Sequence, residues 1–84
     1  MICGKEEMLP RVAEVSAFPE YQLILTFKNG EQKQYNAEPL LHLPMYKNLS
    51  KVFYNAHVEY GTVVWPGDLD IGPDTLYLES KTIL

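Results

Sequence analysis

The dipeptide Asn29-Gly30 constrains the fold of this chain more than any other feature of its sequence. The run before it, residues 21–28, alternates apolar and polar side chains with a period of two, as a half-buried strand does. Asn-Gly is the strongest short-range hairpin signal, because both residues tolerate the positive φ of a type I′ turn. We therefore expect a two-residue loop at this point. That register predicts three cross-strand pairs, which are Lys28 with Glu31, Thr26 with Lys33, and Ile24 with Tyr35.

The strands on either side of residues 21–28 differ in character. Residues 11–17 contain β-branched side chains and run into Phe18-Pro19, so they predict a first strand that ends at a turn. Residues 31–34 are polar on both faces. We expect this third strand to lie at an edge of the sheet, where a partner could reach it.

A second hairpin is predicted near the middle of the chain. Its strands cover residues 56–59 and 62–65 and meet at Tyr60-Gly61. The second of these strands must stop at Pro66-Gly67, because proline cannot donate to a sheet ladder and glycine admits positive φ.

Short helices are predicted in two places. Between residues 36 and 55, Pro39 and Pro44 suit a first helical turn and Ser50 can cap one. Pro73 suits the first turn of a final helix. The residues expected to press on the sheet are Leu40, Leu41, Leu49, Phe53 and Leu76. Together these elements predict an α+β fold, a small antiparallel, hairpin-based sheet covered on one face by short helices.

The length of 84 residues allows one domain. We expect residues 10–84 to form it and residues 1–9 to be a flexible N-terminal tail. A domain of this size buries only about 60–65% of the surface of its unfolded chain. Its core is therefore thin, and self-association or a bound partner would add to its stability.

The compartment is predicted from what the sequence lacks. The first ten residues carry three charges and no long apolar segment, so no signal peptide is expected. No apolar run approaches the roughly 18 residues of a membrane helix. We expect a cytoplasmic chain without a membrane partner. Cys3 is the sole cysteine, which excludes an internal disulfide and leaves a free thiol in the predicted tail.

The charge balance argues against nucleic acid as a partner. Seven basic and eleven acidic residues give a formal net charge of −4, whereas phosphate binding depends on clustered Lys and Arg. The lysines that would have to carry such binding are Lys28, Lys33, Lys47 and Lys51. Residues 59–79, the acidic segment, hold five acids and no Lys or Arg, so this segment can form an acidic face.

Several motifs together resemble those of a known bacterial family. They are the string GTVVWPGDLDIGPDTLY at residues 61–77, the pattern of Leu23, Leu25, Phe27 and Gly30, and the following Pro39-Leu40-Leu41. From Arg11 to Leu78 the chain resembles the family known as domain of unknown function 2442. The resemblance implies a small α+β domain with no established activity, which pairs with a small neighbouring protein in a toxin–antitoxin-like arrangement. This chain departs from the family in its polar third strand and in the spacing of Gly67 and Gly72. Some family members are fused to a DNA-binding helix-turn-helix, but the residues after Tyr77 in this chain are too few to form such a helical pair.

The acidic segment contains a partial match to a calcium-binding loop. Four of its acids occupy positions one, three, seven and twelve of that template, but Gly72 and Pro73 stand where the fifth ligand and the glycine belong. We interpret the acids as turn, helix-start and surface residues. As an alternative function, the segment would make the chain a small-ligand or divalent-metal-binding accessory domain. The candidate metal ligands are then Asp68, Asp70 and Asp74.

No catalytic site is predicted. His42 and His57 lack metal-ligand spacing, and no serine stands in a Gly-x-Ser-x-Gly setting. The glycines do not form a phosphate-binding loop with a following lysine. We therefore expect neither an enzyme nor a cofactor.

Aromatic residues are numerous, with six tyrosines, three phenylalanines and one tryptophan. Aromatic side chains fill thin cores, and they also serve as anchors in protein interfaces. The candidate interface residues are Tyr35, Lys33, Tyr46, Tyr54 and Tyr60. The sequence thus predicts a non-enzymatic protein–protein interaction domain that forms a homo-oligomer or binds a small partner protein through a sheet edge and these aromatic residues.

Overall fold

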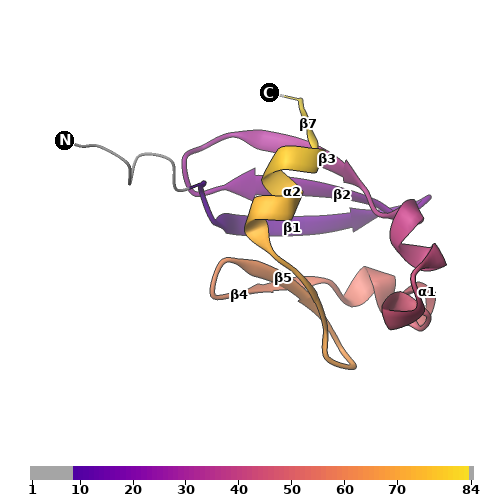
Figure 1. The fold of residues 1–84 in the computed structure, drawn as a ribbon. Helices are drawn as coiled ribbons and strands as arrows, with labels where there is room; N and C mark the ends of the chain where they lie inside the picture. Colours follow the sequence, from indigo (N-terminus) through magenta and orange to yellow (C-terminus); the bar gives the residue numbers. More distant parts are fainter. Residues whose placement is uncertain (1–8, 84) are drawn as a thin grey trace.

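Two antiparallel sheets and several short helices make up the fold (Figure 1). The computed structural model describes residues 9–83. The expectations for the tail at residues 1–9, apart from Leu9, and for Cys3 lie outside this range. Sheet A has the strand order β1-β2-β3-β7, formed by β1 Val12–Phe18, β2 Gln22–Phe27, β3 Gln32–Asn36 and β7 Lys81–Thr82. Sheet B has the order β4-β5-β6, formed by β4 His57–Glu59, β5 Thr62–Trp65 and β6 Leu69–Ile71. The helices are η2 Glu38–His42, η3 Pro44–Tyr46, α1 Leu49–Val52, η4 Phe53–Asn55 and α2 Pro73–Glu79.

The hairpin at Asn29-Gly30 exists, but its loop is longer than predicted. Phe27 pairs with Glu31, whose carbonyl accepts the Phe27 N–H at 2.8 Å, and residues 28–30 form a three-residue loop. Gly30 has a φ of +93°, whereas Asn29 has no positive φ. The Asn29 carboxamide accepts the Glu31 N–H at 2.9 Å, a side-chain turn that competes with the type I′ geometry.

The longer loop shifts the register by one residue. The observed pairs are Thr26 with Gln32, Leu25 with Lys33, Ile24 with Gln34 and Leu23 with Tyr35. The pairs predicted from a two-residue loop are therefore wrong. Since a one-residue slip moves a strand's side chains to the other face, the observed register is the one that brings Tyr35 to the same buried face as Leu23.

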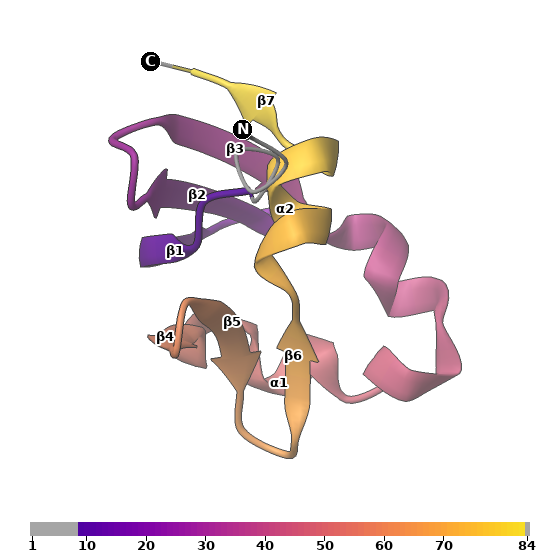
Figure 2. The same ribbon diagram turned by 60° about the vertical axis from the view of Figure 1, so that its left-hand side comes forward.

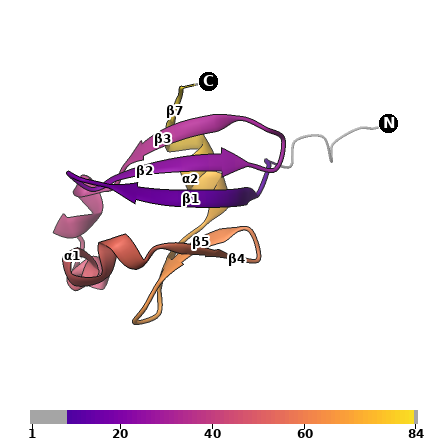
Figure 3. The same cartoon turned by 180° about the vertical axis from the view of Figure 1, so that it is seen from behind.

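Helix α2 covers the buried face of sheet A (Figure 1). Leu76 of α2 is fully buried, and the ring of Tyr77 meets Phe27 edge to face at 5.1 Å between centroids. Figure 3 shows the other face of β1, β2 and β3 without a helix over it. Side-chain amides bond to one another on this open face, for example Gln34 Nε2 to Gln22 Oε1 at 3.0 Å. The predicted α+β architecture with one helix-covered sheet face is confirmed.

The third strand is not an edge strand, contrary to expectation. β7 pairs with it through Lys33 with Thr82 and Gln34 with Lys81, and the Ile83 N–H donates to the Gln32 carbonyl at 3.0 Å. A two-residue strand that follows a helix leaves almost no periodic signal in the sequence. The edges of sheet A are β1 and β7.

Sheet B carries the second predicted hairpin, and the short helices gather at one end of the two sheets (Figure 2). The turn residues Tyr60 and Gly61 have φ of +55° and +80°, so the type I′ turn expected at Asn29-Gly30 occurs here instead. Trp65 Nε1 donates to the Phe53 carbonyl at 3.1 Å and ties sheet B to η4. Buried residues of both sheets and the helices form one hydrophobic cluster. No helix within residues 9–83 has the length and apolar character needed to cross a membrane.

Candidate functional site

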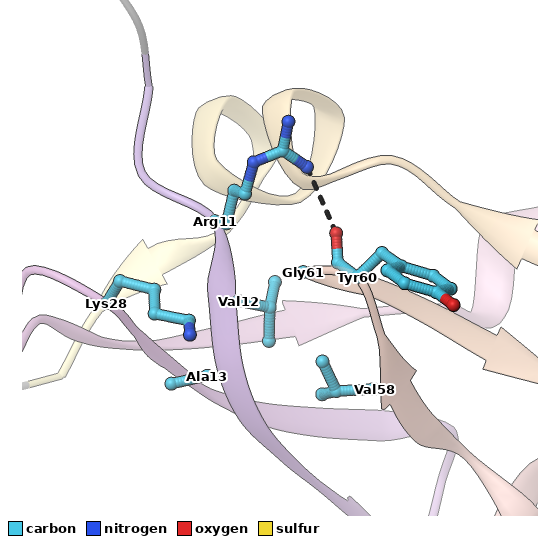
Figure 4. Close-up of a pocket in the computed structure, with 7 residues that line it drawn as sticks. All are labelled: Arg11, Val12, Ala13, Lys28, Val58, Tyr60 and Gly61. Carbon is cyan, nitrogen blue, oxygen red and sulfur yellow. Dashed lines mark hydrogen bonds between the residues drawn. The ribbon is translucent and has the colours of Figure 1, made fainter.

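A pocket of about 530 Å³ lies where the start of β1, the end of β2 and the turn between β4 and β5 meet (Figure 4). Its accessible apolar wall consists of Ala13 and Val58, and the fully buried Val12 also lines it. Arg11 and Lys28 contribute two cationic side chains, so we name it the Arg11–Lys28 pocket. Its volume falls within the range of about 300–1,000 Å³ that is usual for ligand pockets.

Backbone hydrogen bonds join the three segments that form the pocket. The Lys28 N–H donates to the Arg11 carbonyl at 2.8 Å, and the Val12 N–H donates to the Gly61 carbonyl at 3.0 Å. The register of β1 shifts between Val12 and Glu14, so Ala13 is the extra residue of a β-bulge. Bulges re-aim side chains at sheet edges, and this one shapes the pocket's wall.

The side chain of Arg11 is held in place by the β4–β5 turn. Its Nη1 donates to the Tyr60 carbonyl at 3.0 Å, as Figure 4 shows. Its stem packs on Gly61 so closely that a Cβ on Gly61 would lie 2.6 Å from the Arg11 Cβ. Only glycine permits this approach, and its φ of +80° also favours glycine.

The charges of the pocket have no acidic counterpart among the described residues. Within residues 9–83 the one side-chain ion pair joins His57 and Glu59 at 2.9 Å. Arg11 is the sole arginine of a chain whose net charge is −4. Two cations beside apolar side chains can bind an anion through charge-assisted hydrogen bonds. The lining residues that the structure describes include no serine, cysteine, histidine or carboxylate.

Tyr60 stands at the rim of the pocket with 93% of its surface exposed. Its carbonyl faces Arg11, while its ring extends away from the guanidinium along the hairpin (Figure 4). Its φ of +55° lies in the left-handed region, where Asn and Gly are the ordinary residues of a type I′ turn. An aromatic residue is strained there, and its side chain gains no burial in return.

A second hollow of about 480 Å³ lies on the outer face of sheet B. His57, Glu59, Asp68 and Asp70 contribute its titratable side chains. The pKa of His57 is raised, first by its hydrogen bond to the Asn55 carbonyl and then by that to the Glu59 carboxylate. Three of the five acids of the acidic segment, Glu59, Asp68 and Asp70, line this hollow, whereas Asp74 and Glu79 do not.

The proposed metal ligands do not form a cluster. Asp68 follows Gly67 in the β5–β6 turn, Asp70 lies on β6, and Asp74 lies in the first turn of α2. Within residues 9–83 no group of three or more His, Cys, Asp or Glu side chains is arranged to hold a metal ion.

The five candidate interface residues divide into two groups. Tyr35, Tyr46 and Lys33 are 4%, 7% and 9% exposed, so the folded chain does not offer them to a partner. Burial raises the pKa of both tyrosines, and Tyr46 Oη donates to the Asp70 carbonyl at 2.7 Å. Lys33 Nζ donates to the Tyr77 carbonyl at 2.9 Å and lies 3.8 Å from the centre of that ring. Tyr54 and Tyr60 are exposed.

Sequence reasoning missed Arg11 as a site residue. Its partners come from residues about 17 and 49 positions away, as the bonds to Lys28 and Tyr60 show, and no short motif can encode such separations. The one available signal was Tyr60-Gly61, where an aromatic residue occupies a turn position that favours Asn.

Comparison with known families gives a match over most of the chain. A family model described as "Protein of unknown function (DUF2442)" matches residues 12–82. No curated protein and no solved structure matches the chain. The matched range holds every residue of the pocket except Arg11, which directly precedes it.

Proposed function

We propose that this chain, which belongs to the DUF2442 family of proteins of unknown function, is a non-enzymatic protein–protein interaction domain. Its partner is a second copy of the chain or a small different protein. The contact surface is centred on Tyr60 and the Arg11–Lys28 pocket.

The observation that carries this proposal is that Tyr60 has both a left-handed backbone conformation and an exposed ring. A non-glycine residue in the left-handed region costs about 1–2 kcal/mol, and the fold recovers nothing from a ring that is 93% exposed. Glu20, Tyr21 and Asp68 also have positive φ, but Tyr60 alone of the four combines it with a large, almost fully exposed apolar side chain. Tyrosine is among the residues that dominate the binding energy of protein interfaces, so a partner that buries the ring explains its presence.

Further apolar side chains are exposed on the described surface. They are Phe18, Leu43, Met45, Tyr54, Leu78 and Ile83, in addition to Tyr60. Single exposed apolar residues are normal, but aromatic residues and Met are enriched in interfaces. This composition supports binding to protein.

We expected a partner to bind at the edge formed by β3, but the edge of sheet A next to the pocket is β1. β7 covers part of β3, whereas within residues 9–83 β1 pairs with a strand on its β2 side only and its Val12 N–H bonds the Gly61 carbonyl. An edge strand offers unpaired backbone groups to an added strand. The Arg11–Lys28 pocket lies at the start of β1, so an extended partner segment could contact both.

The experiment compares the wild-type chain with Tyr60→Asn and with a control, Met45→Gln. Met45 is also a largely exposed apolar residue, at 69%, but it lies on η3, away from the pocket. Sedimentation velocity measures self-association, and capture from native bacterial extract measures partner binding. We expect the wild type and Met45→Gln to form the same complex and Tyr60→Asn to lose it. A wild-type chain that neither self-associates nor retains a protein contradicts the proposal, as does a complex that Tyr60→Asn retains in full.

A further inference from the structure

We infer that the Arg11–Lys28 pocket recognises a carboxylate on an acidic peptide segment of the partner. This inference rests on the proposed function and adds the chemistry of the partner.

The first step is the orientation of the guanidinium. One N–H of Arg11 is committed to the Tyr60 carbonyl at 3.0 Å, and the stem is packed on Gly61. The group is thereby positioned before a ligand arrives, while its other N–H groups have no partner within residues 9–83. A planar guanidinium matches the two oxygens of a carboxylate in shape and in the spacing of its donors.

The second step concerns competing charges. Glu14 is opposite Thr26 in the register of β1 and β2, and within residues 9–83 no ion pair joins its carboxylate to Arg11 or Lys28. The Glu59 carboxylate bonds to His57 Nε2 at 2.9 Å. Among the residues that the structure describes, neither carboxylate forms an ion pair with Arg11 or Lys28. The pocket is therefore a positive site on a negatively charged chain, and it attracts an acidic partner that the rest of the surface repels.

The third step separates carboxylate from phosphate. Phosphate sites in proteins gather several backbone N–H groups around the anion. Here the N–H of Val12 is bonded to Gly61 and the N–H of Lys28 is bonded to Arg11. What remains are two side-chain cations beside Val12, Ala13 and Val58.

The fourth step favours a peptide over a small free acid. A pocket of about 530 Å³ exceeds what one carboxylate group fills, and its apolar wall suits an aliphatic side chain next to the acidic one. Tyr60 at the rim can cover the segment that follows. An acidic and apolar peptide uses all three features, whereas a small acid uses only the charges.

The test is an NMR titration of the ¹⁵N-labelled chain with three probes. These are a short peptide that alternates glutamate and leucine, the same peptide with glutamine in place of glutamate, and inorganic phosphate. The amide signals of Ala13, Lys28 and Gly61 report on the pocket. The variants are Arg11→Gln and Lys28→Gln, with Lys51→Gln on α1 as an exposed, charge-matched control.

We expect the glutamate peptide to shift the three pocket signals and the glutamine peptide to bind at least about tenfold more weakly, because charge-assisted hydrogen bonds are lost. Arg11→Gln should weaken binding of the glutamate peptide by a similar factor. Lys28→Gln should weaken it by less, and Lys51→Gln should leave it unchanged. Raising the salt concentration should weaken the interaction, because exposed charges are screened.

Three results would overturn the inference. They are equal binding of the two peptides, an unchanged affinity in Arg11→Gln, and tighter binding of phosphate than of the glutamate peptide at the same signals. If no probe binds while the wild type still forms a complex that Tyr60→Asn loses, the carboxylate inference fails and the proposed function stands. If that complex is absent as well, both fail.

Discussion

At the scale of single residues, Gly61 and Tyr60 determine the surface on which the proposed function depends. Gly61 lets the β4–β5 turn approach the stem of Arg11, and Tyr60 supplies the carbonyl that holds the guanidinium. Both residues lie in the left-handed region, one at no cost and the other with strain. The β4–β5 turn thus requires glycine at position 61 and places Tyr60 in a strained backbone conformation.

The contact of Gly61 with Arg11 predicts an order among three glycine variants. Gly61→Ala should lose more than about 2 kcal/mol of unfolding free energy, because it adds both left-handed strain and a clash. Gly30→Ala should lose about 1–2 kcal/mol, because its φ is +93° but nothing lies within 4 Å of the added Cβ. Gly72→Ala has neither problem but replaces the N-cap of α2 with a poorer capping residue, so it should lose less than the other two, about 0.5–1 kcal/mol. Urea denaturation measures all three, and equal losses for Gly61→Ala and Gly30→Ala would show that the packing on Arg11 does not matter.

The strain at Tyr60 predicts that a change can stabilise the chain. Tyr60→Asn places the preferred residue at the first position of the type I′ turn and removes a side chain that is almost wholly exposed. The unfolding free energy should rise by about 0.5–1 kcal/mol. A fall of that size in urea denaturation would mean that the ring stabilises the folded monomer, and the functional reason for it would then be unnecessary.

At the scale of elements, a small network of polar side chains links the β2–β3 hairpin to α2. Tyr77 Oη donates to the Glu31 carboxylate, Asn29 Nδ2 donates to the same carboxylate at 2.7 Å, and Lys33 Nζ bonds the Tyr77 carbonyl. The hydrogen bond from Tyr77 is the main cause that lowers the pKa of Glu31 below 4.5. The same bond raises the pKa of Tyr77 above 10.0.

These pKa shifts predict how the stabilisation from this polar network depends on pH. Because the folded-state pKa of Glu31 is lowered, its contribution is present above pH 4.5 and is lost as the pH falls through the lower folded value. The contribution of Tyr77, whose pKa is raised, is present below pH 10.0 and is lost as the pH rises beyond it. Tyr77→Phe should therefore be less stable than wild type at neutral pH, and the difference should shrink in acid.

Denaturation of Tyr77→Phe and wild type across the acidic range measures this difference. Tyr54→Phe is the matched control, because it removes a hydroxyl from an exposed tyrosine and should change stability little at any pH. A difference between Tyr77→Phe and wild type that stays constant down to the most acidic pH would contradict the assigned role of Glu31.

The elements also show where sequence reasoning succeeds. Both hairpins and the helix at Pro73 were predictable, since alternation, turn residues and proline act locally. The loop at Asn29 was assigned wrongly, because its side chain bonds to Glu31 and selects a three-residue loop that the dipeptide alone does not reveal. β6 and β7 were missed, since both are too short for a periodic signal and neither was recognised as half of a hairpin, as β4 was from Tyr60-Gly61.

At the scale of the whole molecule, one hydrophobic cluster joins two sheets and the helices. The ring of Phe53 in η4 packs on those of Tyr21 and Trp65, whose centroids lie 5.2 and 6.4 Å away. Leu76 of α2 is fully buried in the same cluster. The core residues Leu40, Leu49, Phe53 and Leu76 were predictable from their apolar patterns, whereas the burial of Lys33 was not, because it depends on the ring and carbonyl of Tyr77.

The shared core predicts a single cooperative transition. Trp65 fluorescence reports on sheet B, and far-ultraviolet circular dichroism reports on all elements, so the two urea curves should coincide. Leu76→Ala should lower both midpoints together, with a loss of about 2–5 kcal/mol typical of a buried leucine. Separate midpoints in the wild type or in Leu76→Ala would show that the two sheets unfold independently.

Our proposal is that Tyr60 adopts a strained conformation because its ring binds a partner. The most direct test measures stability and binding on one preparation of Tyr60→Asn. Urea denaturation gives the unfolding free energy, and sedimentation or capture gives the amount of complex relative to wild type. We predict opposite directions, with a folded chain at least as stable as wild type that no longer forms the complex. A variant of equal stability that binds as well as wild type would contradict the central role of Tyr60.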